Sequence, residues 1–415
     1  MLKPPESVDV VVIGAGPSGT VAAALLLQKG YQVRVLEKQH FPRFTIGESL
    51  LPQCMVYLEE AGFADAVNNA GFRLKNGAAF NWGERHSKFS FEEKTTPGPG
   101  TTFQVERARF DKLLADEAAA RGVDIRFGQT IIDCVPTDAG SRVTAEAEDG
   151  SLSQIDCRYV LDASGFGRVL PSLLDLETPS DFPVRRAFFT HIQDGIPKGA
   201  FDRDKILVTI HPKERDIWYW LIPLSDSKCS CGVILSEEKL ATRNAEDPAT
   251  FLREMIAEAP VLAKLLANAQ WPMPVNARTS FSRNVRHLAT DRYALLGNAG
   301  EFLDPIFSSG ITIAMRSSST AVATLVRQLE GETVDWYADY EQPLRQGVNT
   351  FRVFVEAWYE GLFQDVIFFE SQVPSVRNMI SSVLAGYAWD TDNPFVADPM
   401  RRMRALADFC RSAET

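Results

Sequence analysis

A glycine-rich segment at residues 13–19 contains the residues whose types and spacing most clearly indicate chemistry. Gly14 permits a tight turn, Gly16 lets the backbone approach a pyrophosphate group, and Gly19 allows a helix to pack closely on a strand. The helix that begins there offers unpaired N–H groups and the positive end of its dipole to an anion. We therefore expect a dinucleotide to bind this segment. The expected contacts are Gly14, Ala15, Gly16, Pro17, Ser18 and Gly19.

The elements around these glycines follow the order that a dinucleotide site requires. Residues 9–13 are a β-branched run, which is typical of a parallel strand buried on both faces. Residues 20–28 are rich in alanine and leucine and predict a helix, and residues 31–36 predict a second strand. Glu37 ends that strand, eighteen residues after Gly19, where it can accept hydrogen bonds from ribose hydroxyls. The alternative is a glycine turn without a ligand.

A second chemical segment, residues 305–311 (Pro-Ile-Phe-Ser-Ser-Gly-Ile), precedes a predicted helix. Successive backbone N–H groups at the start of a helix bind anions well. Ser309 and Gly310 are therefore expected to face an anion or a negatively charged group.

Two tryptophans form a third feature, in the segment 218–223 (Trp-Tyr-Trp-Leu-Ile-Pro). Trp218 and Trp220 alternate on a predicted strand, so their rings share one face of a sheet. Together with Pro223 they can shield an interior site from water. The alternative is a pair of core tryptophans with no role in a site.

Lys75 is the candidate catalytic residue, on a predicted strand that enters the second lobe. A protonated lysine donates hydrogen bonds, whereas a lysine deprotonated by burial is a nucleophile. An exposed surface cation is the alternative for an isolated lysine.

These segments together resemble the flavin-dependent halogenases, which lie within the single-Rossmann FAD-dependent monooxygenases. The resemblance rests on the glycine segment, on the Trp-x-Trp-x-Ile-Pro motif at 218–223, on residues 72–83 around Lys75 and on residues 302–310. Tryptophan halogenases have a glutamate where this chain has Phe307. The chain therefore is more similar to the halogenases that act on phenols, pyrroles or carrier-bound aromatics, and FAD is the implied cofactor.

The resemblance also assigns site residues. It implies that Lys75 is catalytic and that Ser309 and Gly310 hold a halide, the alternative being that their N–H groups stabilise reduced flavin. Arg107 matches an arginine that reaches the cofactor, and residues 161–165 and 296–299 match further cofactor segments. The additional residues expected to bind FAD are Glu37, Lys38, Arg43, Ser49, Arg107, Asp162, Gly165, Asn298, Pro305, Gly310 and Ile311.

The implied reaction is halogenation of an electron-rich aromatic through a flavin C4a-hydroperoxide and hypohalous acid. Because no second dinucleotide fingerprint is present, we expect a separate flavin reductase as partner. The first alternative is an FAD-dependent monooxygenase that hydroxylates a small molecule or a protein-bound residue. The second is a flavin reductase of the geranylgeranyl-reductase type.

Composition excludes several other classes. The net charge of −11 argues against a nucleic-acid partner, which needs a basic surface. No apolar run is long enough to cross a bilayer, so we expect no membrane partner and a cytoplasmic protein. The cysteines and histidines do not cluster, and we expect no metal.

The predicted fold class is α/β, with a Rossmann-type FAD-binding domain, a mostly antiparallel substrate-binding sheet and a helical C-terminal segment. The FAD-binding domain is expected over residues 1–75, 103–172 and 280–335. The substrate domain is expected over 76–102 and 173–279, and the helical region over 336–415.

Overall fold

The computed structural model describes residues 5–180, 182–279 and 282–414, so the domain boundaries predicted at 1, 280 and 415 lie outside the described residues. Its first sheet has the strand order β7-β2-β1-β10-β9-β8, with β18 paired to β10. The parallel strands are β1 (Glu6–Ile13), β2 (Val33–Glu37), β7 (Asp124–Phe127), β10 (Leu152–Asp162) and β18 (Tyr293–Leu295). The strands β8 (Gln129–Thr137) and β9 (Gly140–Ala147) form an antiparallel hairpin beside β10.

The junction of β1 and α1 (Pro17–Gln28) accepts only glycine at two positions, one in the connecting turn and one in the first turn of the helix. Gly14 has φ +96°, and a Cβ there would lie 2.7 Å from the carbonyl oxygen of Ala163. A Cβ on Gly19 would lie 1.9 Å from the carbonyl oxygen of Gly14. The predicted strand–turn–helix–strand unit is confirmed, and its close packing depends on these glycines.

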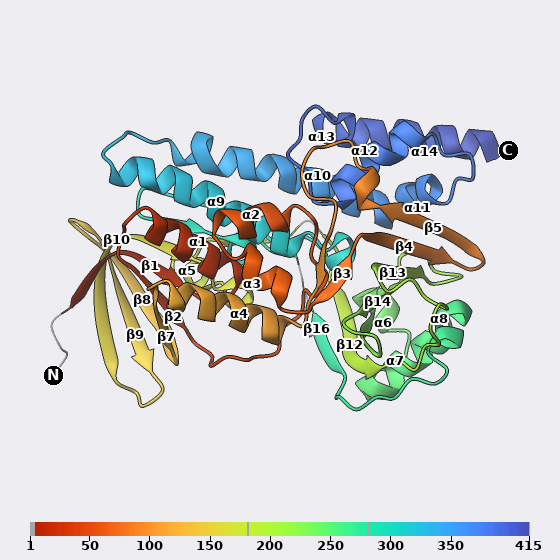
Figure 1. The fold of residues 1–415 in the computed structure, drawn as a ribbon, viewed down its shortest axis with the longest axis horizontal. Helices are drawn as coiled ribbons and strands as arrows, with labels where there is room; N and C mark the ends of the chain where they lie inside the picture. Colours follow the sequence, from red (N-terminus) through yellow and green to blue (C-terminus); the bar gives the residue numbers. More distant parts are fainter. Residues whose placement is uncertain (1–4, 181, 280–281, 415) are drawn as a thin grey trace.

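Helices cover this sheet on the side visible in Figure 1. α9 (Gly310–Leu329) and α4 (Arg107–Ala120) both pack against α1. The shorter helices of this lobe are α2 (Cys54–Glu60), α3 (Ala64–Asn69) and α5 (Val169–Leu173).

The second sheet has the order β16-β12-β15-β14-β13-β4-β5, and its pairs are antiparallel except β13 with β4. Its strands are β4 (Gly77–Trp82), β5 (Arg85–Ser90), β12 (Arg185–Gln193), β13 (Lys205–Ile210), β14 (Trp218–Pro223), β15 (Lys228–Ser236) and β16 (Asn276–Thr279). The predicted mostly antiparallel second sheet is confirmed.

Each face of this sheet packs against a different layer. One face joins the large core of the first lobe, whereas the other packs on α7 (Pro248–Ala257) and α8 (Pro260–Leu265), near α6 (Glu237–Leu240). Two small two-stranded ribbons complete the second lobe and its junction with the first. They are β3 (Arg73–Lys75) with β6 (Thr102–Gln104), and β11 (Glu177–Thr178) with β17 (Asn284–Val285).

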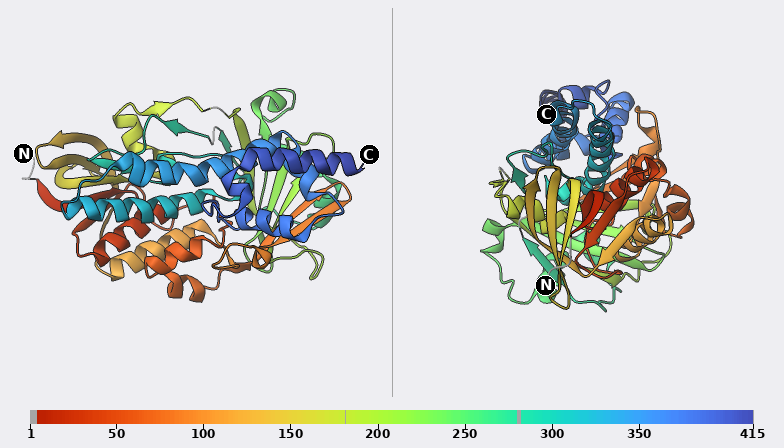
Figure 2. Two further views of the ribbon diagram at one scale, coloured as in Figure 1. Left: turned by 90° about the horizontal axis from the view of Figure 1, so that it is seen from above. Right: turned by 90° about the vertical axis from the view of Figure 1, so that its left-hand side faces the viewer.

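The C-terminal region is helical, as predicted, and its helices gather over β4 and β5 in Figure 1 and along one side of the molecule in Figure 2. They are α10 (Gln342–Tyr359), α11 (Leu362–Ile367), α12 (Pro374–Leu384), α13 (Pro394–Ala397) and α14 (Pro399–Glu414). Among the described residues, no helix is both long and apolar enough to span a membrane.

Candidate active site

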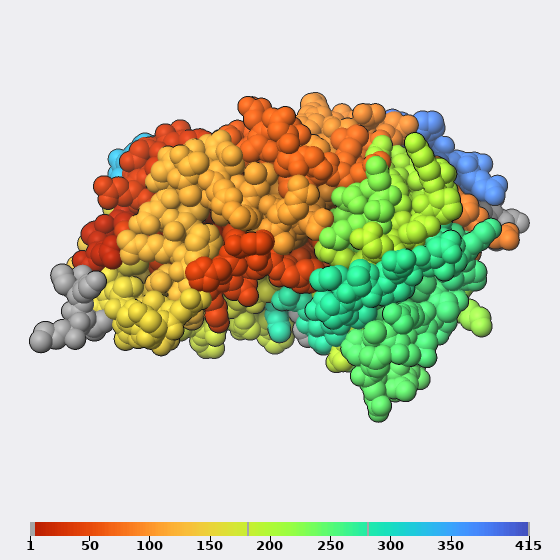
Figure 3. All heavy atoms as spheres, turned by 60° about the horizontal axis from the view of Figure 1, so that its bottom comes forward, coloured from red at the N-terminus to blue at the C-terminus, as the bar shows by residue number. Residues whose placement is uncertain are grey.

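A cavity of about 710 Å³ extends from the turn after β1 to the second sheet. This volume is within the range of roughly 300–1,000 Å³ that ligand sites occupy. In Figure 3 the loop after β2, in red, is exposed between the orange and yellow first lobe and the green second lobe.

Most of the predicted site residues line this one cavity. They are Gly14, Gly16, Pro17, Ser18, Glu37, Lys38, Arg43, Ser49, Arg107, Gly165, Trp218, Trp220, Asn298, Pro305, Gly310 and Ile311. Six others lie outside its wall, namely Ala15, Gly19, Lys75, Asp162, Pro223 and Ser309.

The end of the cavity at α1 has groups that fit the pyrophosphate and ribose of FAD. Glu37 is buried, and its carboxylate accepts hydrogen bonds from the backbone N–H of Ala15 at 2.8 Å and of Gln39 at 2.9 Å. Around Gly16 the nearest atom to an added Cβ, the Nη2 atom of Arg43, is 3.7 Å away. The Nε atom of Arg43 is buried without a hydrogen-bond partner, and the nearest acid, Glu37, is 3.9 Å away. A fixed acid, an open glycine and a guanidinium N–H that lacks an acceptor are groups that a bound dinucleotide would complete.

Arg107 is held by an acid that sequence reasoning missed. Its Nε and Nη2 atoms donate to the two carboxylate oxygens of Asp111 at 2.8 and 2.9 Å, and its Nη1 donates to the Ile46 carbonyl at 2.9 Å. Arg43 approaches the same Asp111 at 3.2 Å. Asp111 therefore orients two cavity-lining cations. Its spacing, four residues after Arg107 on a predicted helix, was the available signal.

Asp162 lies behind the cavity wall rather than in it. Its carboxylate accepts hydrogen bonds from the backbone N–H of Ser164 at 2.9 Å and of Leu170 at 2.6 Å. Burial raises the pKa of this carboxyl. These bonds fix the turn at Gly165, which does line the cavity.

The loop before α9 presents the start of that helix to the cavity. Asp304 caps the short turn 305–307 by accepting a hydrogen bond from the Ile306 N–H at 3.0 Å. Ser308 adopts a left-handed conformation with φ +56°, after which α9 begins at Gly310. The first N–H groups of a helix have no intrahelical partner. Ser309 is buried and Gly310 lines the cavity, so the positive end of the α9 dipole faces the cavity.

The two tryptophans lie on the same face of β14, with ring centroids 5.9 Å apart. The indole of Trp218 donates to the Tyr359 hydroxyl at 3.0 Å, and that of Trp220 donates to the Ser230 hydroxyl at 3.1 Å. Tyr359 in turn donates to Asp304 at 2.9 Å. Tyr359 could not be predicted from the sequence, because this contact depends on the packing of α10.

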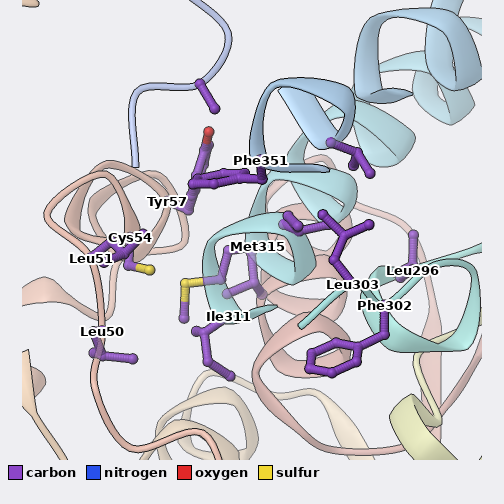
Figure 4. Close-up of a cluster of buried hydrophobic side chains, with 14 of the residues drawn as sticks. Leu50, Leu51, Cys54, Tyr57, Leu296, Phe302, Leu303, Ile311, Met315 and Phe351 are labelled. Carbon is purple, nitrogen blue, oxygen red and sulfur yellow. The ribbon is translucent and has the colours of Figure 1, made fainter. Parts of the chain in front are cut away.

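Lys75 is 1 % exposed and therefore is not a surface cation. Its Nζ atom donates to the Leu50 carbonyl at 2.7 Å and lies 5.4 Å from the centre of the Phe91 ring. Burial lowers the pKa of Lys75 to about 7. Leu50 adjoins Ser49 of the cavity wall, and Figure 4 shows it among the buried hydrophobic side chains of the core. Both the amine and the ammonium of Lys75 are therefore present near neutral pH.

An aromatic cluster occupies the region around the loop before α9. Phe307 packs against Phe354 at 6.0 Å, Trp358 at 6.2 Å and Phe363 at 5.2 Å between ring centroids. Phe80 of β4 contacts the same Trp358 and Phe363. This apolar wall separates the loop from solvent on the C-terminal side.

Known proteins are similar to this chain in sequence and overall fold. The family described as "FAD binding domain" matches residues 7–349. A solved flavoprotein/dehydrogenase from Cytophaga hutchinsonii is 41% identical, with a TM-score of 0.94 over 99% of this chain and 100% of that chain. The 1H-pyrrole-2-carbonyl-[peptidyl-carrier protein] chlorinase of Pseudomonas fluorescens is 26% identical over 96% of this chain and 94% of its own. The structure of flavin-dependent brominase Bmp2 is 25% identical, with a TM-score of 0.82 over 98% of this chain and 100% of that chain.

The family match agrees with the residues that line the cavity, because both indicate FAD as the cofactor. The comparisons also confirm the resemblance drawn from the glycine, tryptophan and lysine motifs. The chain belongs to the FAD-binding domain family, and it is similar along nearly its whole length to flavin-dependent halogenases.

Proposed function

We propose that this enzyme halogenates an electron-rich aromatic ring, either a phenol, a pyrrole or an aromatic acyl group tethered to a carrier protein. The observation that carries the proposal is the buried Lys75, whose Nζ atom donates to the Leu50 carbonyl and whose pKa is lowered by burial to about 7. A buried lysine with a lowered pKa is suited to a catalytic role, because perturbed pKa values cluster at functional sites.

Bound reduced FAD would supply two electrons to oxygen. The partly reduced oxygen would then oxidise a halide to hypohalous acid. The protein's own residues bind and orient the components. The start of α1 and Glu37 hold the pyrophosphate and ribose, and Arg43 adds a positive charge. The N–H groups at Ser309 and Gly310 hold the halide at the start of α9, where the helix dipole favours an anion.

Lys75 then directs the electrophile. Its ammonium form donates a hydrogen bond to the oxygen of hypohalous acid and draws electrons from the oxygen–halogen bond. Its amine form can instead take the halogen and transfer it to the ring. Apolar surroundings such as Phe91 exclude water from Lys75, which would otherwise compete for the electrophile.

The proposed partners follow from the same chemistry. A separate reductase supplies reduced FAD, and the pyrrole-carrier chlorinase among the relatives supports a carrier-tethered substrate. We also propose that the protein acts in the cytoplasm. The three-part domain division is likewise a proposal, in which residues 336–415 close the site beside Phe307.

The test is to supply the purified protein with reduced FAD, oxygen and bromide together with phenols, pyrroles and aryl acyl-carrier substrates. We expect a brominated product, recognised by its mass. Oxygen insertion that does not depend on bromide would overturn the proposal in favour of a hydroxylase.

Lys94→Met is the matched control for Lys75→Met. Lys94 also donates to one carbonyl, that of Gly98 at 2.7 Å, and lies 5.2 Å from one aromatic ring, that of Tyr387, but unlike Lys75 it is only partly buried and is outside the 72–83 motif. We expect Lys75→Met to lower bromination by at least about a hundredfold and Lys94→Met to leave it unchanged.

A further inference from the structure

We propose that Glu48 and His191 form a proton relay that carries one proton per turnover from solvent into the cavity. This inference rests on the proposed function, because halogenation consumes a proton. Neither residue is in any of the motifs described above, and they are 143 residues apart in the sequence.

The two side chains are joined by a short hydrogen bond in the interior. The Nε2 atom of His191 is 2.6 Å from the Oε1 atom of Glu48, and the side chains are 10% and 1% exposed. The second carboxylate oxygen of Glu48, Oε2, is buried and has no hydrogen-bond partner within the described chain. Glu48 itself lines the cavity. A buried carboxylate oxygen left unpaired costs free energy unless a ligand or a proton completes it.

Its position places this pair at the reactive end of the cavity. Ala187 and Phe189 of β12 line the cavity, and His191 lies two residues further along, on the same face of the strand. Glu48 is two residues before Leu50, whose carbonyl accepts the hydrogen bond from Lys75. Glu48 therefore lines the cavity where the second sheet meets the segment 48–50, and His191 lies directly behind Glu48.

The other end of the relay approaches solvent. The ring of Phe44 meets that of His191 edge-on at 5.6 Å, and Phe44 is 50% exposed. Phe44 is in the loop after β2 that is open to solvent in Figure 3. The imidazole thus lies between an exposed side chain and a buried carboxylate, which is the order that a relay requires.

The charged groups on neighbouring elements have partners of their own. Arg107 of α4 is bound by Asp111. Lys228 of β15 is paired with Glu106 at 2.7 Å. On the remaining sides, Lys75 of β3 is bonded to the Leu50 carbonyl, and the residue opposite His191 on β15 is the neutral Ser230. His191 is therefore the hydrogen-bonding partner that Glu48 has among these groups.

The proton balance follows from the overall reaction. With reduced FAD as its monoanion, the reaction converts oxygen, one halide ion, two protons and the aromatic substrate into FAD, the halogenated substrate and two molecules of water, and the relay carries one of these protons. The imidazole of His191 takes the proton from solvent and passes it through Nε2 to Oε1 of Glu48. The carboxylic acid formed in this way releases a proton to the cavity, and both groups return to their starting state.

The experiment follows single-turnover oxidation of bound reduced FAD by oxygen, which forms hydrogen peroxide and also takes up one proton. The variants are Glu48→Gln and His191→Gln, which keep a hydrogen-bonding group at each position. His211→Gln is the matched control, because His211 is also buried and pairs with Glu258 at 2.9 Å, outside the cavity. We expect both relay variants to react about tenfold more slowly above neutral pH, with the control unchanged. In His191→Ala, added imidazole is expected to restore the rate.

A second readout uses the protein without cofactor. The hydrogen-bonded imidazole proton of His191 should give a downfield NMR signal that disappears in Glu48→Gln and persists in His211→Gln. Unaltered oxidation rates, or slower rates that neither pH nor imidazole changes, would overturn the relay. Because this assay needs no halide or aromatic substrate, a relay that fails is distinguishable from a halogenase assignment that fails.

Discussion

The hydroxyl of Tyr359 donates a hydrogen bond to the buried carboxylate of Asp304 at 2.9 Å. The same hydroxyl accepts a hydrogen bond from the indole of Trp218 at 3.0 Å, and the Arg185 guanidinium lies 3.3 Å from the centre of its ring. One phenol on α10 therefore joins the C-terminal helices, the second sheet and the loop before α9. This contact gives the C-terminal region a definite part in positioning the proposed halide site.

We predict that Tyr359→Phe destabilises the protein and loosens the loop before α9. Without the hydroxyl, the Trp218 N–H and one oxygen of Asp304 remain buried and unpaired, which costs about 1–3 kcal/mol of unfolding free energy. Urea denaturation measures this loss of stability. The halide concentration needed for half-maximal turnover reports whether the loop before α9 has loosened. An unchanged denaturation midpoint would show that the network is unimportant.

Lys75 should make stability depend on pH in a definite direction. Burial lowers the pKa of Lys75 from 10.5 to about 7 in the folded chain. Between these values the unfolded chain holds one more proton at this site, so the free energy of unfolding contributed here rises with pH, by about 1.4 kcal/mol per pH unit. Lys75→Met removes this term. Urea unfolding of both proteins gives the free energy of unfolding at each pH from 7 upward. Plotted against pH, the two free energies should converge as the wild type gains stability, and parallel plots would contradict the burial of Lys75.

Two glycines of the first turn should respond differently to alanine. At Gly19 the new Cβ would lie 1.9 Å from a backbone oxygen, so we expect Gly19→Ala to unfold the domain. At Gly16 the nearest atom would be 3.7 Å away, and Gly16→Ala should fold yet bind FAD about tenfold or more weakly, because the methyl group occupies space that the pyrophosphate needs. Thermal unfolding and flavin fluorescence titration measure the two effects. Equal FAD affinity in Gly16→Ala would contradict the assigned site.

Asp111→Asn tests the acid that orients Arg43 and Arg107. It leaves a buried guanidinium without its carboxylate, which costs about 3–5 kcal/mol. Asp116→Asn, which removes an exposed partner of Lys112 on the same helix, should cost less than about 1 kcal/mol. Chemical denaturation of the two variants gives the comparison, and similar losses would refute the special role of Asp111.

The sequence predicts local elements well where their signals are local. Residues 9–37 contain the complete β-branched, glycine and helix pattern, and the structure confirms the unit. Cys229 and Cys231 alternate along β15, and both are buried; burial raises the pKa of the Cys231 thiol to about 12. The fold class followed from the same kind of periodicity. The domain boundaries and the roles of the site residues stay predictions.

The contacts that complete the site could not be predicted in the same way. Tyr359 reaches Asp304 from 55 residues away, and His191 reaches Glu48 from 143 residues away. Both pairs form only when elements distant in sequence pack together. A lysine such as Lys75 is ordinarily exposed, so composition alone gives no reason to expect its burial. Its motif indicated a role, whereas its environment came only from the structure.

The measurement that tests the account most directly compares wild type, Lys75→Met and Lys94→Met with reduced FAD, oxygen, bromide and the best substrate of the panel. Aryl bromide is quantified by mass spectrometry, and hypobromous acid released into solution is trapped by a scavenger. We expect Lys75→Met to release hypobromous acid while forming almost no aryl bromide, with Lys94→Met matching the wild type. Undiminished bromination by Lys75→Met would contradict the central claim.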